Sequence, residues 1–129
     1  MNWAISVVIS EEETIETRLQ ALVSYVIANN HVEHFFIDDI DATGYTGNQI
    51  TQRLNIQNKR LEISTKELLA LMSEDGQIFD LDLVLSNSFK FRFIISDGYY
   101  LEIVSNGQRL PDSVVGPYNE LDLSLFPDF

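Results

Sequence analysis

Apolar residues recur along this chain at two kinds of spacing, which are typical of helices and of strands. Over residues 10–30 they fall at intervals of three and four, as on one face of a helix: Ile15, Leu19, Leu22, Val23 and Val26. Ser10 and Glu13 have the spacing of a capping box, in which two side chains satisfy free N–H groups at a helix start. We therefore predict a helix that begins at Ser10 and ends at Asn29-Asn30.

A second capping box, formed by Ser64 and Glu67, precedes a short apolar run and predicts a second helix, which Asp75-Gly76 ends. Residues 3–9 and 32–40 are rich in β-branched and aromatic residues, which predicts two strands. Residues 41–48 contain Gly44 and Gly47 and are predicted to form a loop. Residues 49–63 alternate weakly, which favours a hairpin.

Residues 77–105 alternate apolar and polar positions and predict a three-stranded meander. The alternating apolar sets begin at Phe79, Phe89 and Tyr99. A one-residue slip would move every side chain to the other face. The register that keeps the apolar sets together places Leu85 opposite Phe89 and Ile95 opposite Tyr99. Both loops then have three residues, 86–88 and 96–98, with Gly98 in the left-handed conformation. The polar face of this register aligns Asp82, Arg92 and Glu102.

These elements together predict an α+β fold. We expect a single mainly antiparallel β-sheet of five or six strands, with two α-helices packed on one face. Residues 1–129 are predicted to form one domain, because no linker or internal repeat divides them. Leu121, Leu123 and Leu125 alternate near the end, and they indicate either a last edge strand or a docked tail.

Charge restricts the possible partners. Eight basic residues and twenty acidic residues give a formal net charge of −12. Such a surface repels phosphate backbones, so we expect no nucleic-acid binding. The chain has no cysteine, which excludes disulfides and thiolate chemistry. The apolar start lacks a basic leader, and no apolar stretch has the length of a bilayer span. A cytoplasmic protein without membrane contact is therefore expected.

Candidate chemistry is sparse. Residues 39–44 match the opening of a calcium-binding EF-hand loop, but the twelfth position, where a bidentate Glu is required, is Ile50. His31 and His34 are the two histidines, and their spacing in a strand points them to opposite faces. No nucleotide-binding or nucleophile-elbow motif is present. We therefore predict no catalytic, cofactor-binding or metal-binding residues.

An acidic chain without reactive groups favours a binding role. We expect a small protein-binding module, most concretely an immunity protein that neutralises a basic nuclease toxin, since a nuclease must present a positive cleft. The predicted contact residues are Asp38, Asp39, Asp41, Tyr45, Tyr99 and Tyr100. Two alternatives remain open. One is a structural or adaptor subunit that assembles through a sheet edge or the C-terminal tail. The other is a metal-dependent enzyme at His31, His34 and the aspartates.

Overall fold

The computed structural model describes residues 1–73 and 76–129, and within them seven strands form one antiparallel sheet. The strands are β1 (Trp3–Val7), β2 (His34–Ala42), β3 (Leu61–Ile63), β4 (Ile78–Ser86), β5 (Lys90–Ser96), β6 (Tyr100–Ser105) and β7 (Tyr118–Glu120). Their order across the sheet is β3-β2-β4-β5-β6-β1-β7. The predicted α+β class and antiparallel sheet are confirmed, but the predicted number of strands, five or six, was too low.

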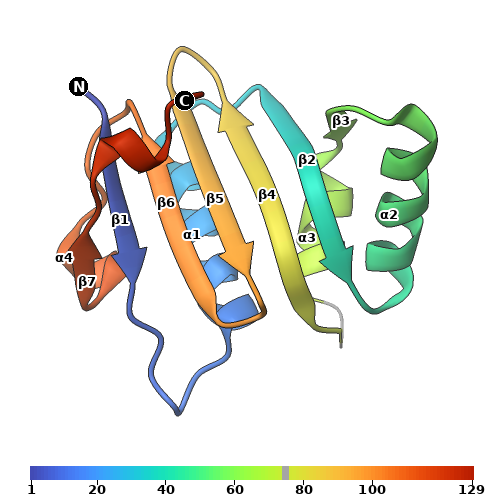
Figure 1. The fold of residues 1–129 in the computed structure, drawn as a ribbon, viewed down its shortest axis with the longest axis horizontal. Coiled ribbons are helices and arrows are strands. Elements are labelled where there is room, and N and C mark those ends of the chain that lie inside the picture. The colour runs from blue at the N-terminus through green and yellow to red at the C-terminus, as the bar shows by residue number, and fades with distance from the viewer. Residues whose placement is uncertain (74–75) are drawn as a thin grey trace.

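The helices lie mainly on one side of this sheet. They are α1 (Ile15–Asn29), α2 (Tyr45–Gln57), α3 (Thr65–Ser73) and the short α4 (Asp112–Val115), followed by the 3₁₀ turn η1 (Leu123–Leu125). In Figure 1, α1 and α3 lie behind the sheet, whereas α2 lies beside β2 and β3 at one edge. The main core lies between the helices and the inner face of the sheet, where Leu19, Leu68 and Phe93 are fully buried.

The apolar face predicted for the first helix is buried as expected, but the helix starts later than predicted. Thr14 is its N-cap, and the Thr14 hydroxyl accepts the Thr17 N–H at 3.1 Å. Ser10 and Glu13 instead form a turn before the helix, in which the Ser10 N–H donates to Glu13 Oε1 at 3.3 Å. Residues 10–13 therefore form a connection between β1 and α1, and this connection borders the candidate site described below.

The capping box predicted for the next helix, α3, is present. The Ser64 N–H donates to Glu67 Oε1 at 3.0 Å, and the Glu67 N–H donates to Ser64 Oγ at 3.1 Å. These two bonds satisfy N–H groups that have no partner inside the helix. The helix is described up to Ser73, and of its predicted end at Asp75-Gly76, Asp75 lies outside the described residues.

Helix α2 occupies residues where a loop and a hairpin were predicted. Gly47 caused the error, because a glycine inside a helix usually weakens it. Here a side chain at Gly47 would place its Cβ 3.2 Å from Ala42 Cβ, so the glycine lets the helix pack closely on β2. Besides Gly47, the buried residue of α2 is Ile50, and Asn58, in the left-handed conformation, is the C-cap that follows the helix. Of the predicted hairpin, the structure contains the short strand β3.

The meander has the predicted apolar faces, but its register differs by two residues from the predicted one. Leu85 lies opposite Phe91, and Ile95 lies opposite Leu101. The loops consequently comprise residues 87–89 and 97–99. Phe89 and Tyr99, which were predicted to face inward, lie in these loops and are exposed. A shift of two residues preserves the face of each paired side chain, so Leu85, Phe91, Ile95 and Leu101 still point into the core, whereas Phe89 and Tyr99 do not.

The same shift alters the polar face. Arg92 lies directly opposite Val84 and Val104 instead of Asp82 and Glu102, so the predicted alignment of three charges was wrong. Arg92 still reaches Asp82 diagonally across the strands, with a closest N–O distance of 2.7 Å.

The C-terminal segment lies on the outer face of the sheet, opposite α1 and α3 (Figure 1). Asp128 and Phe129 border a cavity of about 260 Å³ together with Arg60, Lys90 and Arg92. Leu123 and Leu125 lie in the turn η1, and Leu121 follows the end of β7 at Glu120, so the alternating leucines do not form an edge strand. A docked tail, the second possibility in the sequence, is therefore the observed one.

Candidate protein-binding site

Three aspartates, Asp39, Asp41 and Asp80, lie on the outer face of β2 and β4, and we call them the acidic strip. The register shifts at Asp38, which gives β2 one extra residue, and the alternation shifts with it. Ile37, Ile40 and Ala42 are consequently buried, whereas Asp39 and Asp41 are exposed. Asp41 lies directly opposite Asp80, and Asp39 lies opposite Asp82. Like charges placed directly opposite each other destabilise a sheet.

Two arginines neutralise the acids beside the strip but not the strip itself. Arg60 binds Asp38 through two hydrogen bonds, of 2.7 and 2.8 Å. Arg92 binds Asp82 in the same bidentate way, at 2.9 and 2.7 Å. Among the residues that the structure describes, no ion pair involves Asp39, Asp41 or Asp80. The strip therefore carries negative charge that the fold leaves uncompensated.

The carboxylate partners stabilise the charged form of both arginines. The hydrogen bonds to Asp38 raise the pKa of Arg60 against the opposing effect of burial, and the charges of Asp38 and Asp82 raise it further. The pKa of Arg92 is raised by its hydrogen bonds to Asp82, again against burial, and by the charge of Asp38. Each arginine thus responds to the carboxylates of both pairs, and these four residues form one local charge network.

Tyr99 and Tyr100 lie at the turn between β5 and β6 and are 74% and 55% exposed. Their rings meet edge to face, with 5.1 Å between centroids. Asp97 and Gly98 both have positive φ, and the Tyr99 N–H donates to the Ser96 carbonyl at 3.1 Å. This is the geometry of a type I′ turn. The left-handed conformation predicted for Gly98 is confirmed, and the turn holds both tyrosines out from the sheet.

The turn is linked to the acidic strip through β4. The Asp97 N–H donates to Asp80 Oδ1 at 3.2 Å, and the Gly98 N–H donates to the Phe79 carbonyl at 2.6 Å. Because Asp80 lies opposite Asp41 on the next strand, the strip and the tyrosines belong to one end of the sheet. Phe79 is an extra residue in β4 at this point and is 37% exposed, so its predicted place in the core was wrong.

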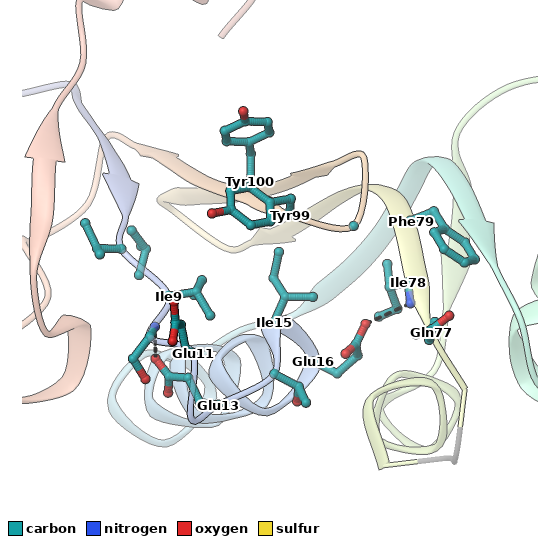
Figure 2. Close-up of a pocket in the computed structure, with 15 residues that line it drawn as sticks. Ile9, Glu11, Glu13, Ile15, Glu16, Gln77, Ile78, Phe79, Tyr99 and Tyr100 are labelled. Atoms are coloured by element: carbon teal, nitrogen blue, oxygen red, sulfur yellow. Dashed lines mark hydrogen bonds between the residues drawn. The ribbon is translucent and has the colours of Figure 1, made fainter.

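A cleft of about 430 Å³ lies next to the tyrosines, between the end of β1, the start of α1 and the β5–β6 turn. We call it the tyrosine cleft. Buried apolar side chains line it, namely Val7, Ile15 and Ile78. Figure 2 shows Tyr99 on one side of the cleft and Glu11, Glu13 and Glu16 on the opposite side, whereas the ring of Tyr100 points away from the cleft. A volume of this size lies within the range of roughly 300–1,000 Å³ that is typical of small-ligand sites.

The carboxylates at the cleft differ in their partners. Glu13 is held by Arg18 through hydrogen bonds of 2.9 to 3.2 Å. Glu16 accepts the Ile78 N–H at 2.9 Å, which ties α1 to the start of β4. For the described part of the chain, neither Glu11 nor Glu16 has an ion pair. The negative charge at the cleft is therefore only partly compensated.

The structure brings together four of the six predicted contact residues. Asp39, Asp41, Tyr99 and Tyr100 share one end of the sheet through β4. Asp38 is instead engaged by Arg60. Tyr45 was predicted to lie in a loop but is the first residue of α2, where it is 72% exposed and its hydroxyl accepts a hydrogen bond from Gln49 at 2.7 Å.

Sequence reasoning missed Asp80, Glu11 and Glu16 as members of this region. Asp80 occupies a polar position of the meander, but its neighbour Asp41 is far away in sequence and no local pattern links the two. The three consecutive glutamates at residues 11–13 were assigned to a helix start. Three charged residues between two apolar segments indicate an exposed loop, and this pattern could have identified them as surface residues.

The features that suggested metal chemistry are not arranged for it. In residues 1–73 and 76–129, no three His, Asp or Glu side chains are placed to hold a metal ion. Ile50, at the position of the missing calcium ligand, is fully buried in α2. His34 Nδ1 lies 2.7 Å from Glu62 Oε2, and its ring stacks on Phe36.

Comparisons with protein-family models, with curated protein sequences and with solved structures found no match for this chain. Across the described ranges, no helix has both the length and the apolar character needed to cross a bilayer. Function is therefore inferred from the geometry and the charge of the molecule itself.

Proposed function

We propose that this protein is an acidic protein-binding module that neutralises a basic partner, most specifically an inhibitor of a nuclease-type toxin. The observation that supports this role best is the acidic strip, in which Asp41 lies opposite Asp80 and, among the described residues, neither carboxylate has an ion pair. Such an arrangement costs stability in the free protein. A partner that brings positive charge to Asp39, Asp41 and Asp80 relieves that repulsion. This relief contributes favourably to the free energy of binding.

The exposed tyrosines supply the second element of an interface. Aromatic residues, tyrosine in particular, are enriched among the residues that contribute most to protein–protein binding. Tyr99 and Tyr100 lie at the same end of the sheet as the strip. The negative field guides a basic partner toward this end and accelerates association, and the tyrosines then contribute to slow dissociation.

Paired capture tests the proposal. The wild-type chain, Asp41→Asn and Glu33→Gln are immobilised and exposed to lysate of the native host, and recovered proteins are quantified by mass spectrometry. Both variants remove one negative charge, but Glu33 precedes β2 at the opposite end of that strand from Asp41. We expect a basic protein that wild type and Glu33→Gln recover equally and that Asp41→Asn recovers less well.

The captured protein is then produced alone and assayed. We expect it to cleave nucleic acid, and we expect stoichiometric addition of this chain to stop the cleavage. The association rate should fall steeply with added salt, and more steeply for wild type than for Asp41→Asn. Recovery of no basic protein refutes the binding role. A basic partner whose nuclease activity is absent or unaffected refutes the inhibitor role and leaves the binding role.

A further inference from the structure

The tyrosine cleft combines an apolar lining with an aromatic wall and carboxylates. Ile15 and Ile78 are buried and form part of the lining, and Tyr99 is exposed beside them. This combination suits a long side chain with a methylene stem and a charged end. The stem packs on apolar side chains while the charged end stays near water and polar groups.

The charge of the cleft determines the sign of its ligand. The described lining includes three glutamates but no lysine, arginine or histidine. The nearest candidate cation, Arg18, is not free to enter, because it is bound to Glu13 and donates to the carbonyls of Val114 and Val115 at 3.1 and 2.9 Å. Within the part of the chain that the structure describes, no cation pairs with Glu11 or Glu16, and a positively charged group from outside complements them.

We propose that the tyrosine cleft receives one arginine side chain of the basic partner. This inference rests on the proposed function and specifies how the partner is anchored. A guanidinium group is planar, so it can stack on the ring of Tyr99. It also carries five N–H donors, which allows it to approach carboxylates on the opposite wall while it stacks. A lysine ammonium is a compact point charge and serves these two contacts less well.

The geometry of Figure 2 matches these two requirements. Tyr99 forms one side of the cleft, Glu11 and Glu16 lie on the other side, and Ile15 lies between them. An apolar side chain of similar size would fill the same space, but it would leave the charge of Glu16 unpaired. An acidic group would be repelled by all three glutamates.

Small ligands test the cleft independently of any partner. The ¹⁵N-labelled protein is titrated at low salt with Nα-acetyl-arginine amide, with the lysine analogue and with the citrulline analogue, a neutral isostere of arginine. We expect saturable shifts of the backbone amide signals of Ile9, Ile78, Tyr99 and Tyr100. The arginine ligand should bind a few-fold more tightly than the lysine ligand and at least tenfold more tightly than the citrulline ligand.

Matched variants assign the effect to the cleft. Glu11→Gln should weaken arginine binding about two- to fivefold, as expected for an exposed ion pair. Glu12→Gln is the control, because Glu12 is adjacent and exposed but does not line the cleft. Tyr99→Leu should weaken binding about two- to fivefold through loss of the cation–π contact. Circular dichroism and the unaffected amide signals verify that each variant is folded.

The outcomes separate this inference from the proposed function. Equal shifts with the arginine and citrulline ligands, or equal weakening by Glu11→Gln and Glu12→Gln, refute the arginine site. In that case a loss of partner capture by Asp41→Asn would still support the binding role. Conversely, specific arginine binding without recovery of a basic partner would support the arginine site and refute the proposed function.

Discussion

The opposed carboxylates of the acidic strip predict that removing a charge stabilises the fold. Asp41 lies directly opposite Asp80, and the described residues offer neither of them an ion-pair partner. In Asp41→Asn this repulsion disappears, and the new amide stays exposed at the same position. The free energy of unfolding should therefore increase.

The size of the effect follows from the register. Directly opposite residues in an antiparallel pair have Cβ atoms about 4.5–5.5 Å apart. Two unit charges roughly 6 Å apart repel each other by about 0.7 kcal/mol in water. Salt screens part of this repulsion, so we expect a gain of about 0.5 kcal/mol. For a chain of this length, such a gain raises Tm by about 2 °C.

Asp38→Asn is the matched control on the same strand. It makes the same chemical change and also removes one negative charge from a net charge of −12. Asp38, however, holds Arg60 through two hydrogen bonds, and the pair is partly exposed. Losing a pair of this kind costs about 0.2–1 kcal/mol. The two variants should therefore shift stability in opposite directions.

Urea denaturation and thermal melting, each at low and at high salt, measure the difference. The stabilisation by Asp41→Asn should shrink as salt increases, because the repulsion is screened in the wild type. If both variants stabilise the protein equally, relief of overall charge is responsible and the local pairing is not. If Asp41→Asn destabilises it, the carboxylate has a favourable partner and the reasoning about the strip is wrong.

Two further predictions concern the core and the capping box. Phe93 is fully buried, so Phe93→Ala should lower the free energy of unfolding by about 3–5 kcal/mol in urea titrations. Phe89 lies in an exposed loop, so Phe89→Ala should lower it by less than about 1 kcal/mol. Similar losses for the two variants would refute the observed register. Burial disfavours the charged form of Glu67, but the hydrogen bonds from Ser64 and Arg53 outweigh it and lower its pKa. The stabilisation from this ionised carboxylate is present above the ordinary carboxyl pKa and is lost as pH falls through the lowered one. The stability difference between wild type and Glu67→Gln, measured by denaturation from pH ~7 to pH ~3, should therefore shrink on acidification. A difference that stays constant over this range would contradict the role of the charge.

The parts of the fold that depend on local patterns were predictable from the sequence. The buried face of α1 follows from its helical spacing, and the start of α3 follows from Ser64 and Glu67. The inward residues of β4 to β6 follow from alternation, which is insensitive to the shift of two residues in the register. In each case, the residues that determine the structure are close together in sequence.

Helix α2 was not predictable by this means, because its stability depends on contacts with β2. It buries few side chains, and Gly47 is favourable only because Ala42 lies against it. The register of the meander failed for a related reason. Phe89 and Tyr99 have the residue types of a core, but the type I′ turn at Asp97-Gly98 and the loop at residues 87–89 place them at the surface.

The candidate site was only partly predictable. Exposed tyrosines near a turn and aspartates on a strand are visible in the sequence, but their proximity depends on β4 lying between β2 and β5. That order results from pairing between segments distant along the chain. The same order adds Asp80 to the strip and, through the Glu16 bond to Ile78, places the start of α1 beside the tyrosines.

The two edges of the sheet limit how copies of this protein can associate. The outermost strands, β3 and β7, have only three residues each. A strand from a second molecule would find few backbone groups to pair with there, and α2 packs against β2, of which β3 covers only Phe35 to Ile37. Fibril growth by strand addition is therefore disfavoured at either end. Association with other molecules is therefore expected to depend more on exposed side chains than on strand pairing.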